Sequence, residues 1–247
     1  YYTRIVSDDF KNYNLELMAK FSGAAFFISL VEILITKDRA GYFAYLNPNY
    51  LGSIMMMASI LNLYLALKKK SKRNFLLFIL NFSTILLSGS RSSLAAAVIG
   101  IFVLLYYFLE KRYFVACVFL LIGYVIGVYY GVLPFLREDT IVKYYWLRRD
   151  ILKMAYNAFK TNILFGHGNF YYFKFTKFYP HSHNAITELL LSYGIVGTLA
   201  LMGVWLRYIY DIFKDDKSNV LKISIVSGVV AHNLTDFPIF WIQTVIL

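Results

Sequence analysis

Residues 50–87 read YLGSIMMMASILNLYLALKKKSKRNFLLFILNFSTILL, two apolar runs joined by a short basic segment. Apolar runs of this kind suit α-helices that cross the roughly 30 Å hydrocarbon core of a bilayer, although the second run is short for that purpose. Five of the six residues at 68–73 are Lys or Arg, and such residues gather in the cytoplasmic loops of membrane proteins. The stretch therefore predicts two membrane helices whose connecting loop lies in the cytoplasm.

The composition of the whole chain agrees with a membrane protein. Of its 247 residues, 59% are hydrophobic and 16% are charged, and the mean hydropathy is +0.57; soluble domains carry charge on about a quarter of their residues. Apolar runs occur at 21–36, 50–67, 75–87, 93–109, 114–133, 185–209 and 220–234, and another begins near Pro238. These runs lack the period-two alternation of barrel strands. We therefore expect an all-α, polytopic transmembrane helix bundle.

The basic balance of the chain, a formal net charge of +11, could indicate a nucleic-acid-binding protein. We assign it to membrane topology instead, because the densest basic block lies in a short loop between apolar runs, and we expect no nucleic-acid partner. The single cysteine, Cys117, excludes a disulfide within the chain and a Cys-rich metal site. Residue 1 is Tyr rather than Met and Leu247 ends inside an apolar run, so we expect residues 1–247 to be one transmembrane domain of an incomplete chain.

The basic loops also predict which segments face outward. With residues 68–73 in the cytoplasm, alternation of the spans places residues 110–112 and 214–217 there as well. The outward segments are then 36–49, 88–92, 134–184 and 236–238. Basic residues in these segments break the positive-inside trend, among them Lys37, Arg39, Arg91, Arg137, Arg148 and Arg149. Charges retained on this side of a membrane usually serve a purpose, and we expect anion binding.

Residues 134–184 form the only sizeable segment between apolar runs, so we expect a large outer loop. Within residues 141–161, apolar residues recur at helical spacing, namely Trp146, Ile151, Met154 and Ala158, while the other face carries Arg148, Arg149, Lys153 and Lys160. A basic helix of this kind lies on a membrane surface. That interpretation accounts for most of the helix but not for the Arg148-Arg149 pair.

Three of the four histidines of the chain, His167, His181 and His183, lie in this loop. In one interpretation the last two flank a helix start, with Asn184 as the N-cap and Glu188 in the first turn. A metal site would need a third ligand, from His167 or Glu188, and no HExxH-type spacing supports it. In the third interpretation a histidine is a general base or polar positioner, because histidine titrates near neutrality.

Other outward residues could bind a phosphate. Arg91 lies in Ser88-Gly89-Ser90-Arg91-Ser92-Ser93 at the start of a predicted helix, where backbone N–H groups beside a guanidinium would cradle an anion. Alternatively, Arg91 reaches toward the interface from a helix end. Arg39 could join it. Asp236 could orient a histidine, pair with an arginine or form a simple turn.

Glycines and prolines mark two tight segments. Asn47-Pro48-Asn49 is typical of a turn that starts a helix. Gly166-His167-Gly168 implies tight backbone turns or close approach of a ligand.

Taken in order, these motifs resemble the O-antigen ligase and polysaccharide polymerase superfamily of bacterial membrane glycosyltransferases. The resemblance covers about residues 36 to 240 and rests on Asn47-Pro48-Asn49, Gly89-Ser90-Arg91, Arg148, Leu164-Phe165-Gly166-His167-Gly168-Asn169-Phe170, His181-Ser182-His183-Asn184, Glu188 and Tyr193-Gly194-Ile195-Val196-Gly197. Members of this family have more transmembrane helices than this chain shows.

The resemblance implies a GT-C-like bundle in the bacterial cytoplasmic membrane, with the active site facing outward under the large loop. It implies a polyprenyl-diphosphate-linked glycan as donor, undecaprenyl diphosphate being the carrier, and neither a cofactor nor a metal ion. By matching positions, Arg91 and Arg148 would engage the diphosphate and His183 would be the essential histidine. Arg149 adjoins Arg148, so either could be the functional arginine. The remaining candidates for substrate contact are Arg39, Arg149, His167, His181, Asn184 and Asp236.

We therefore expect a metal-independent glycosyltransferase of the cell envelope. The abundance of Lys, Asn, Ile, Tyr and Phe is typical of an AT-rich genome and favours a capsule or surface polysaccharide polymerase over a ligase to a lipid or protein acceptor. Membrane lipids, a glycan acceptor and other polysaccharide-assembly proteins are the expected partners. Two alternatives from other classes are a transporter or flippase for lipid-linked glycans and a non-catalytic scaffold that binds anionic lipid. A transporter should carry its charges near the midplane and show inverted repeats.

Overall fold

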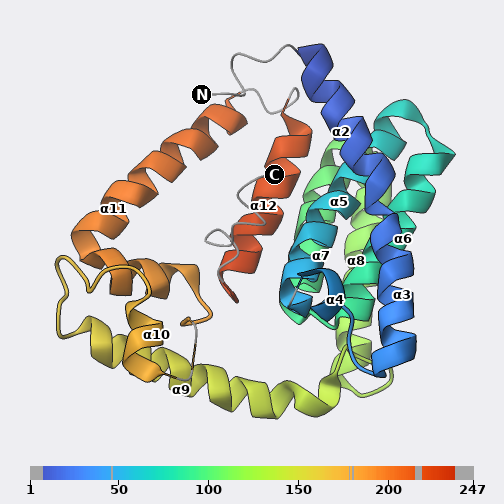
Figure 1. Ribbon diagram of the computed structural model, residues 1–247. Helices are drawn as coiled ribbons and strands as arrows, with labels where there is room; N and C mark the ends of the chain where they lie inside the picture. The colour runs from blue at the N-terminus through green and yellow to red at the C-terminus, as the bar shows by residue number, and fades with distance from the viewer. Residues whose placement is uncertain (1–7, 46, 178, 180, 215–218, 237–247) are drawn as a thin grey trace.

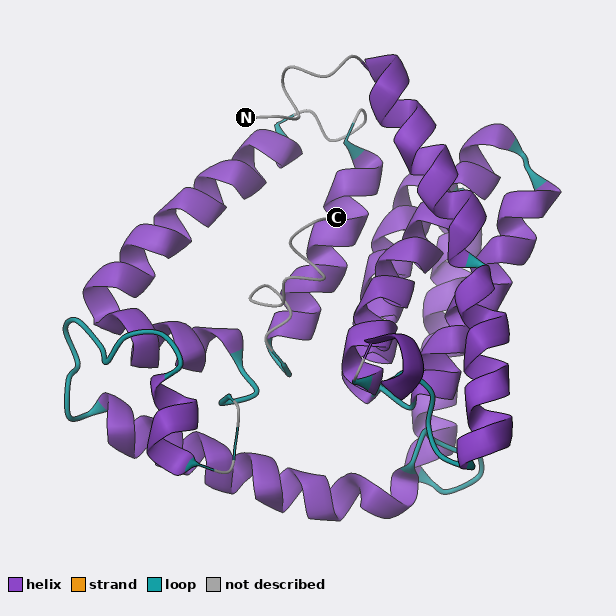
Figure 2. Cartoon of the chain, in the orientation of Figure 1, coloured by secondary structure: helices purple, strands orange, loops and turns teal. Residues whose placement is uncertain are grey.

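The computed structural model describes residues 8–45, 47–177, 179, 181–214 and 219–236, and across these ranges the chain is helical with no strand (Figures 1 and 2). The elements in order are α2 (Asp8–Ser22), α3 (Ala24–Thr36), α4 (Tyr42–Tyr45), α5 (Pro48–Lys69), α6 (Lys72–Ser88), α7 (Arg91–Phe108), α8 (Lys111–Tyr129), the 3₁₀ turn η1 (Glu138–Thr140), α9 (Ile141–Phe159), α10 (Tyr171–Thr176), α11 (Ala185–Phe213) and α12 (Val220–Asn233). The all-α prediction is confirmed.

Five segments of the described chain are long and apolar enough to cross a membrane. They are Asn12–Thr36, Pro48–Lys69, Arg91–Phe108, Lys111–Tyr129 and Ala185–Phe213, and the apolar helix α12 is shorter. Each coincides with a predicted apolar run, so the polytopic prediction is confirmed. The predicted run at 75–87 is helix α6, and the run near Pro238 lies outside the described residues.

Helix α5 is the centre of the bundle, and α6, α7 and α12 pack around it (Figure 1). Its buried side chains include Leu51, Met56 and Ile60. Small residues allow the close approach that membrane helices use. A Cβ atom on Gly100 of α7 would lie 2.4 Å from Cδ1 of Ile60 and 2.8 Å from the carbonyl oxygen of Ser224 in α12. The backbone of α7 at Gly100 is therefore in direct contact with a side chain of α5 and with the backbone of α12.

Side-chain caps explain where the helices begin. The side chains of Asn47, Ser71, Ser90 and Asn184 accept hydrogen bonds from backbone N–H groups in the first turns of α5, α6, α7 and α11, respectively. Each satisfies a donor that has no partner within its own helix. The predicted helix start at Asn47-Pro48-Asn49 and the predicted N-cap at Asn184 are confirmed.

Helix α9 crosses the end of the bundle from α8 to the lower part of α11 (Figure 1). Its buried residues Ile151, Ala155 and Ala158 pack against Tyr172 of α10 and Leu191 of α11. Trp146, predicted to lie on the same apolar face, is 48% exposed. Helix α9 therefore packs through its buried residues against α10 and α11.

The loop after α9 is joined to α11 by backbone hydrogen bonds. Helix α11 breaks at Gly194, whose φ of 63° and ψ of −170° lie in a region that only glycine enters easily. The N–H groups of Ile195 and Val196 donate to the carbonyls of Ile163 and Leu164. In return, the carbonyls of Leu191 and Ser192 accept from the N–H groups of His167 and Gly168. The break thus provides two donors and two acceptors that hold the loop in place.

Candidate active site

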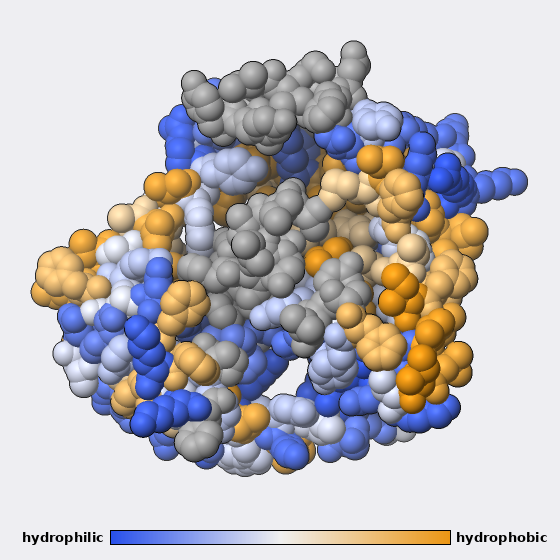
Figure 3. Space-filling model, viewed as in Figure 1, coloured by the Kyte–Doolittle hydropathy of each residue, from blue (hydrophilic) through white to orange (hydrophobic). Residues whose placement is uncertain are grey.

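A cavity of about 140 Å³ lies where α9 crosses the ends of α5 and α7. Its lining residues come from five parts of the chain: Arg39, Asn49, Gly89, Arg91, Ser92, Arg137, Tyr144, Leu147, Arg148, Ile151 and His183. The space-filling view shows hydrophilic residues around the hollow above α9 (Figure 3). The cavity therefore brings together a histidine and four arginines that are distant in sequence.

Two of the arginines, Arg39 and Arg91, donate hydrogen bonds to neighbouring segments of the chain. Nε of Arg39 donates to the carbonyl of Ser88 over 2.8 Å, and its Nη2 donates to Oδ1 of Asn49 over 2.9 Å. Burial first, and the positive charge of Arg137 second, lower the pKa of Arg39 below its ordinary value. Arg91 is the first residue of α7, and its Nη1 donates to the carbonyl of Arg137 over 3.1 Å.

Tyr144 of α9 supports the arginine group with its ring. The guanidinium of Arg91 lies 5.9 Å and that of Arg137 lies 5.4 Å from the ring centroid, within the range of cation–π attraction. Arg137 is held in the left-handed backbone region, with φ of 54°, directly before η1. Helix α9 therefore orients two arginines that come from different segments.

The four cavity arginines, Arg39, Arg91, Arg137 and Arg148, form no ion pair with any carboxylate among the described residues. Buried or crowded charges are normally paired, because desolvation and repulsion are costly otherwise. Ser92, in the first turn of α7, also lines the cavity, so the N-terminal end of this helix adds partial positive charge. The cavity is chemically suited to a polyvalent anion such as a diphosphate.

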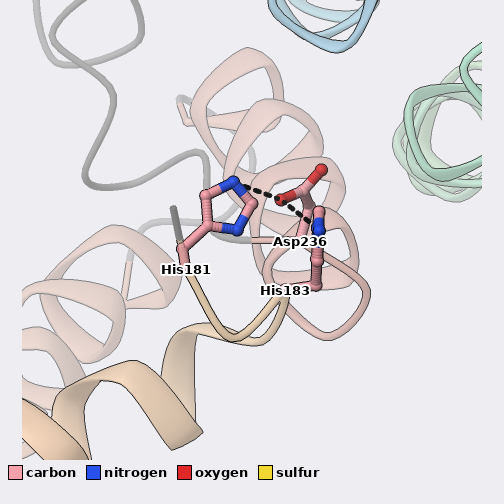
Figure 4. Close-up of side chains that lie close together, drawn as sticks. All are labelled: His181, His183 and Asp236. Atoms are coloured by element: carbon pink, nitrogen blue, oxygen red, sulfur yellow. Dashed lines mark ion pairs between the residues drawn. The ribbon is translucent and has the colours of Figure 1, made fainter. Parts of the chain in front are cut away.

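Beside the cavity, two histidines converge on one carboxylate (Figure 4). Nδ1 of His183 lies 3.4 Å and Nε2 of His181 lies 3.9 Å from Oδ1 of Asp236. The other carboxylate oxygen, Oδ2, accepts a hydrogen bond of 3.3 Å from Nδ2 of Asn49. The Asp236 side chain is fully buried, and that of His183 is 25% exposed. Asn49 thus links this group to Arg39 in the cavity wall.

The electrostatics of this group favour a charged carboxylate and a neutral imidazole at His181. Burial alone would raise the pKa of Asp236, but its contacts with His183, His181 and His232 outweigh burial and hold that pKa below its ordinary value. Burial, followed by repulsion from His183, lowers the pKa of His181 to about 3. Asp236 is therefore ionised, and His181 uncharged, at neutral pH.

His232 ties Asp236 to the core. Its backbone carbonyl accepts from the N–H of Asp236 over 2.9 Å. Its buried imidazole lies between two hydroxyls, with Nδ1 3.4 Å from Oγ of Ser53 and Nε2 3.3 Å from Oγ of Ser93. Ser93 is in turn 2.8 Å from the α7 cap, Oγ of Ser90. One histidine therefore connects α5, the start of α7 and the end of α12 behind the site.

The turn at His181–Asn184 is clamped on both sides. The N–H of Ser182 donates to Oε2 of Glu188 over 3.0 Å, and Nδ2 of Asn184 donates to the carbonyl of Leu234 over 3.0 Å. The placement of Glu188 in the first turn is confirmed. His183 has a φ of 55°, a costly conformation for a residue with a Cβ atom. The clamps keep this backbone in place and the imidazole beside Asp236.

Two predicted candidates lie elsewhere. Nε2 of His167 lies 3.0 Å from Oγ1 of Thr161 and 3.0 Å from the carbonyl of Ala158, and its ring stacks on Tyr171. Arg149 pairs with its neighbour Asp150, and its guanidinium lies over the Trp146 ring. Of the two adjacent arginines, only Arg148 lines the cavity. His167 and Arg149 thus have structural partners outside the cavity.

The structure brings a different third residue to His181 and His183 from the two that the sequence suggested, His167 and Glu188. Glu188 accepts from the N–H of Ser182 and His167 contacts Thr161, whereas Asp236 approaches both His181 and His183. Asp236 was a candidate for orienting a histidine, and it does lie against His183.

Sequence reasoning missed three residues of the site, namely Asn49, Tyr144 and His232, whereas Arg137 belongs to the basic residues for which anion binding was expected. A signal existed for Asn49, which belongs to the Asn47-Pro48-Asn49 motif. His232, a lone histidine in the last turn of an apolar helix four residues before Asp236, offered a weaker signal. Tyr144 offered none among 22 tyrosines.

A family model described as O-antigen ligase matches residues 75–202, which run from α6 to the middle of α11. The matched region contains Arg91, Arg148 and His183. No curated protein matches the chain.

Proposed function

The chain belongs to the O-antigen ligase family of membrane glycosyltransferases, and on that premise we propose that it transfers a glycan from a polyprenyl-diphosphate carrier in the arginine-lined cavity. The observation that carries the proposal is the placement of His183 in the same cavity wall as four arginines that no described carboxylate neutralises. A diphosphate supplies the missing negative charge. Arginine suits this task because its planar fork binds phosphate oxygens in pairs.

In the proposed reaction, a hydroxyl of the acceptor sugar attacks the anomeric carbon of the donor glycan. The bond between that carbon and the diphosphate oxygen breaks, and the polyprenyl diphosphate leaves with the electron pair. Arg91 and Arg148 stabilise the growing charge on the leaving group, as fixed cations do in phosphate chemistry. The cavity arginines Arg39 and Arg137 extend this binding surface.

His183 takes the proton of the acceptor hydroxyl. The ionised carboxylate of Asp236 faces Nδ1 of His183, so the neutral imidazole carries its hydrogen on Nδ1 and keeps the Nε2 lone pair as the base. A base held in this way typically contributes about 10²- to 10⁴-fold to a rate. Asp236 and Asn49 act as positioning residues, because they hold the imidazole and contact no substrate in this scheme.

The position of the cavity supports action on the outer face of the bacterial cytoplasmic membrane. Helix α5 begins at Pro48, next to the cavity residue Asn49, and ends at Lys69 in the basic segment 68–73. The two ends of a membrane-spanning helix lie on opposite sides, and basic loops stay in the cytoplasm. The cavity then opens outward, where residues 134–184 form the large outer loop of a single transmembrane domain.

Within the family we propose a polymerase of capsule or surface polysaccharide, for which the acceptor is a second lipid-linked repeat unit and no metal ion takes part in transfer. A transporter fits the site less well, because no cavity arginine lies in the middle of a candidate membrane span: Arg91 begins α7, Arg39 and Arg137 lie in loops, and Arg148 lies in α9, which is not such a span.

Incubation of the purified full-length protein with a lipid-linked repeat unit tests this function. A polymerase yields a ladder of longer lipid-linked glycans with release of polyprenyl diphosphate, and a ligase yields product only when a separate acceptor is added. Arg91→Ala should abolish transfer, whereas Arg112→Ala, which removes an exposed arginine paired with Glu110 at the other end of the bundle, should not. Equal activity of both variants would contradict the proposal.

A further inference from the structure

The group formed by His181, His183 and Asp236 has a second capability. We propose that it is a binding site for a divalent transition-metal ion such as Zn²⁺, and that an ion bound there inhibits the enzyme. The inhibitory part rests on the proposed function, in which His183 is the base. The binding part rests on the geometry of the three side chains alone.

The spacing of the three groups is close to that of a zinc site. Ligand atoms about 2.0–2.2 Å from a tetrahedral zinc ion lie roughly 3.3–3.6 Å from one another. Oδ1 of Asp236 lies 3.4 Å from Nδ1 of His183 and 3.9 Å from Nε2 of His181. One ligand atom from each residue lies within 4.8 Å of the other two. Small side-chain shifts are enough to bring all three into coordination range.

The chemistry of the group favours the same ions. Two imidazoles and one carboxylate suit zinc, copper and nickel better than magnesium or calcium, which prefer oxygen ligands. A metal ion binds the unprotonated nitrogen of an imidazole and an ionised carboxylate, and each of the three residues offers one such ligand atom. Asn49 holds the second carboxylate oxygen, as outer partners of metal ligands do.

The charged surroundings of the three groups set the expected affinity for a metal ion. Arg148 and the other cavity arginines repel a cation, so we expect weaker affinity than that of a structural zinc site. The fourth coordination position would be taken by water from the cavity beside His183.

Coordination explains inhibition through the tautomer of one imidazole. A metal ion bound at Nδ1 of His183 takes the lone pair of that nitrogen, so the hydrogen of the neutral ring must reside on Nε2. Nε2 then has no lone pair with which to accept the proton of an acceptor hydroxyl. The ion would also add positive charge next to the donor diphosphate and hold His183 in one position.

Binding is tested with Co²⁺, a coloured probe for zinc sites, on full-length protein purified in detergent without a histidine tag and stripped with chelator. The expected result is one cobalt ion per chain with tetrahedral absorption bands, displaced by Zn²⁺. The bands should disappear in His181→Ala and Asp236→Asn and persist in His167→Gln, whose histidine lies outside the group. Absence of bands in the wild type, or their persistence in His181→Ala, would overturn the site; size-exclusion profiles verify that each variant is folded.

Inhibition is tested in the transfer assay with Zn²⁺, with and without chelator. Zinc should stop transfer, and the chelator should restore it. Mg²⁺ at the same concentration should not stop transfer, although it also binds diphosphates. Undiminished or increased transfer with zinc bound would overturn the inhibitory role. If the metal-free protein shows no transfer at all, the proposed function fails, while the cobalt spectra still decide the metal site.

Discussion

The segment between α8 and α11 contains two histidine segments that look alike in sequence but differ in structure. At Gly166-His167-Gly168, the imidazole contacts the Thr161 hydroxyl, the Ala158 carbonyl and the stacked Tyr171 ring. At His181-Ser182-His183, the imidazoles face Asp236, and His183 also lines the arginine cavity. Backbone N–H groups of the first segment bond to α11, whereas the second segment places a histidine side chain in the cavity wall. A histidine is therefore assigned a role by its partners, not by its local sequence.

The largest expected effect separates the two segments directly. We expect His183→Ala to reduce transfer by about 10²- to 10⁴-fold, the usual contribution of a general base. His167→Ala should act only through reduced stability, because its contacts lie outside the cavity. Transfer rates from a purified lipid-linked repeat, compared with melting temperatures in detergent, measure the difference. Full activity of His183→Ala at unchanged stability would refute its role as the base.

A second test separates two neighbouring residues of α9. Arg148 lines the cavity, whereas Arg149 pairs with Asp150. We expect Arg148→Ala to lower the transfer rate by about 10²- to 10³-fold, the usual cost of removing one stabilising donor. Arg149→Ala should change the rate less than Arg148→Ala, since an exposed ion pair contributes little. The reverse ranking in the same assay would show that the cavity arginine is not the functional one.

A third test concerns the first histidine segment and the break at Gly194 to which its loop is bonded. A Cβ atom on Gly194 would lie 2.2 Å from the carbonyl oxygen of Leu164, and the glycine has a φ of 63°. We expect Gly194→Ala to cost at least about 1–3 kcal/mol of stability, from backbone strain. Gly203→Ala, in the same helix with nothing within 4 Å of the added Cβ, is the matched control. Thermal melting should show a lower midpoint only for the first variant; equal midpoints would contradict the role of Gly194 in joining the loop to α11.

The smallest expected effect is a pH dependence of stability that arises from His181 in the second histidine segment. The pKa of His181 is about 3 in the folded chain, against an ordinary value of 6.5. The unfolded chain therefore binds a proton that the folded chain refuses, and stability is lost as pH falls from about 6.5 toward 3. We expect His181→Gln to lose less stability than the wild type between pH 7 and pH 4.5. Parallel melting curves for the two proteins would contradict this.

The parts of the fold that depend on local sequence were predictable. The helix starts at Asn47, Ser90 and Asn184 follow from cap residues before apolar runs, and the spans follow from run length. The candidates Arg91, Arg148, His183 and Arg39 all line one cavity. Their catalytic roles remain predictions.

The rest depends on contacts that no local pattern records. Asn49 meets Asp236 across 187 positions of the chain, and Ser93 meets His232 across 139. The mutual hydrogen bonds between residues 163–168 and residues 191–196 are of the same kind. For this reason the sequence identified the motif around Gly194 without explaining it, and it could not distinguish the fixed His167 from the cavity-lining His183.

The amino-acid sequence by itself determined that this is a helical membrane protein, because apolar run length and helix caps are properties of neighbours along the chain. Only the tertiary structure decided which histidine faces a carboxylate, which of two arginines enters the cavity and that Asp236, not Glu188 or His167, completes the group with His181 and His183. Those assignments depend on how α5, α7, α9 and α12 pack. Packing depends on the shapes of surfaces that are distant in sequence.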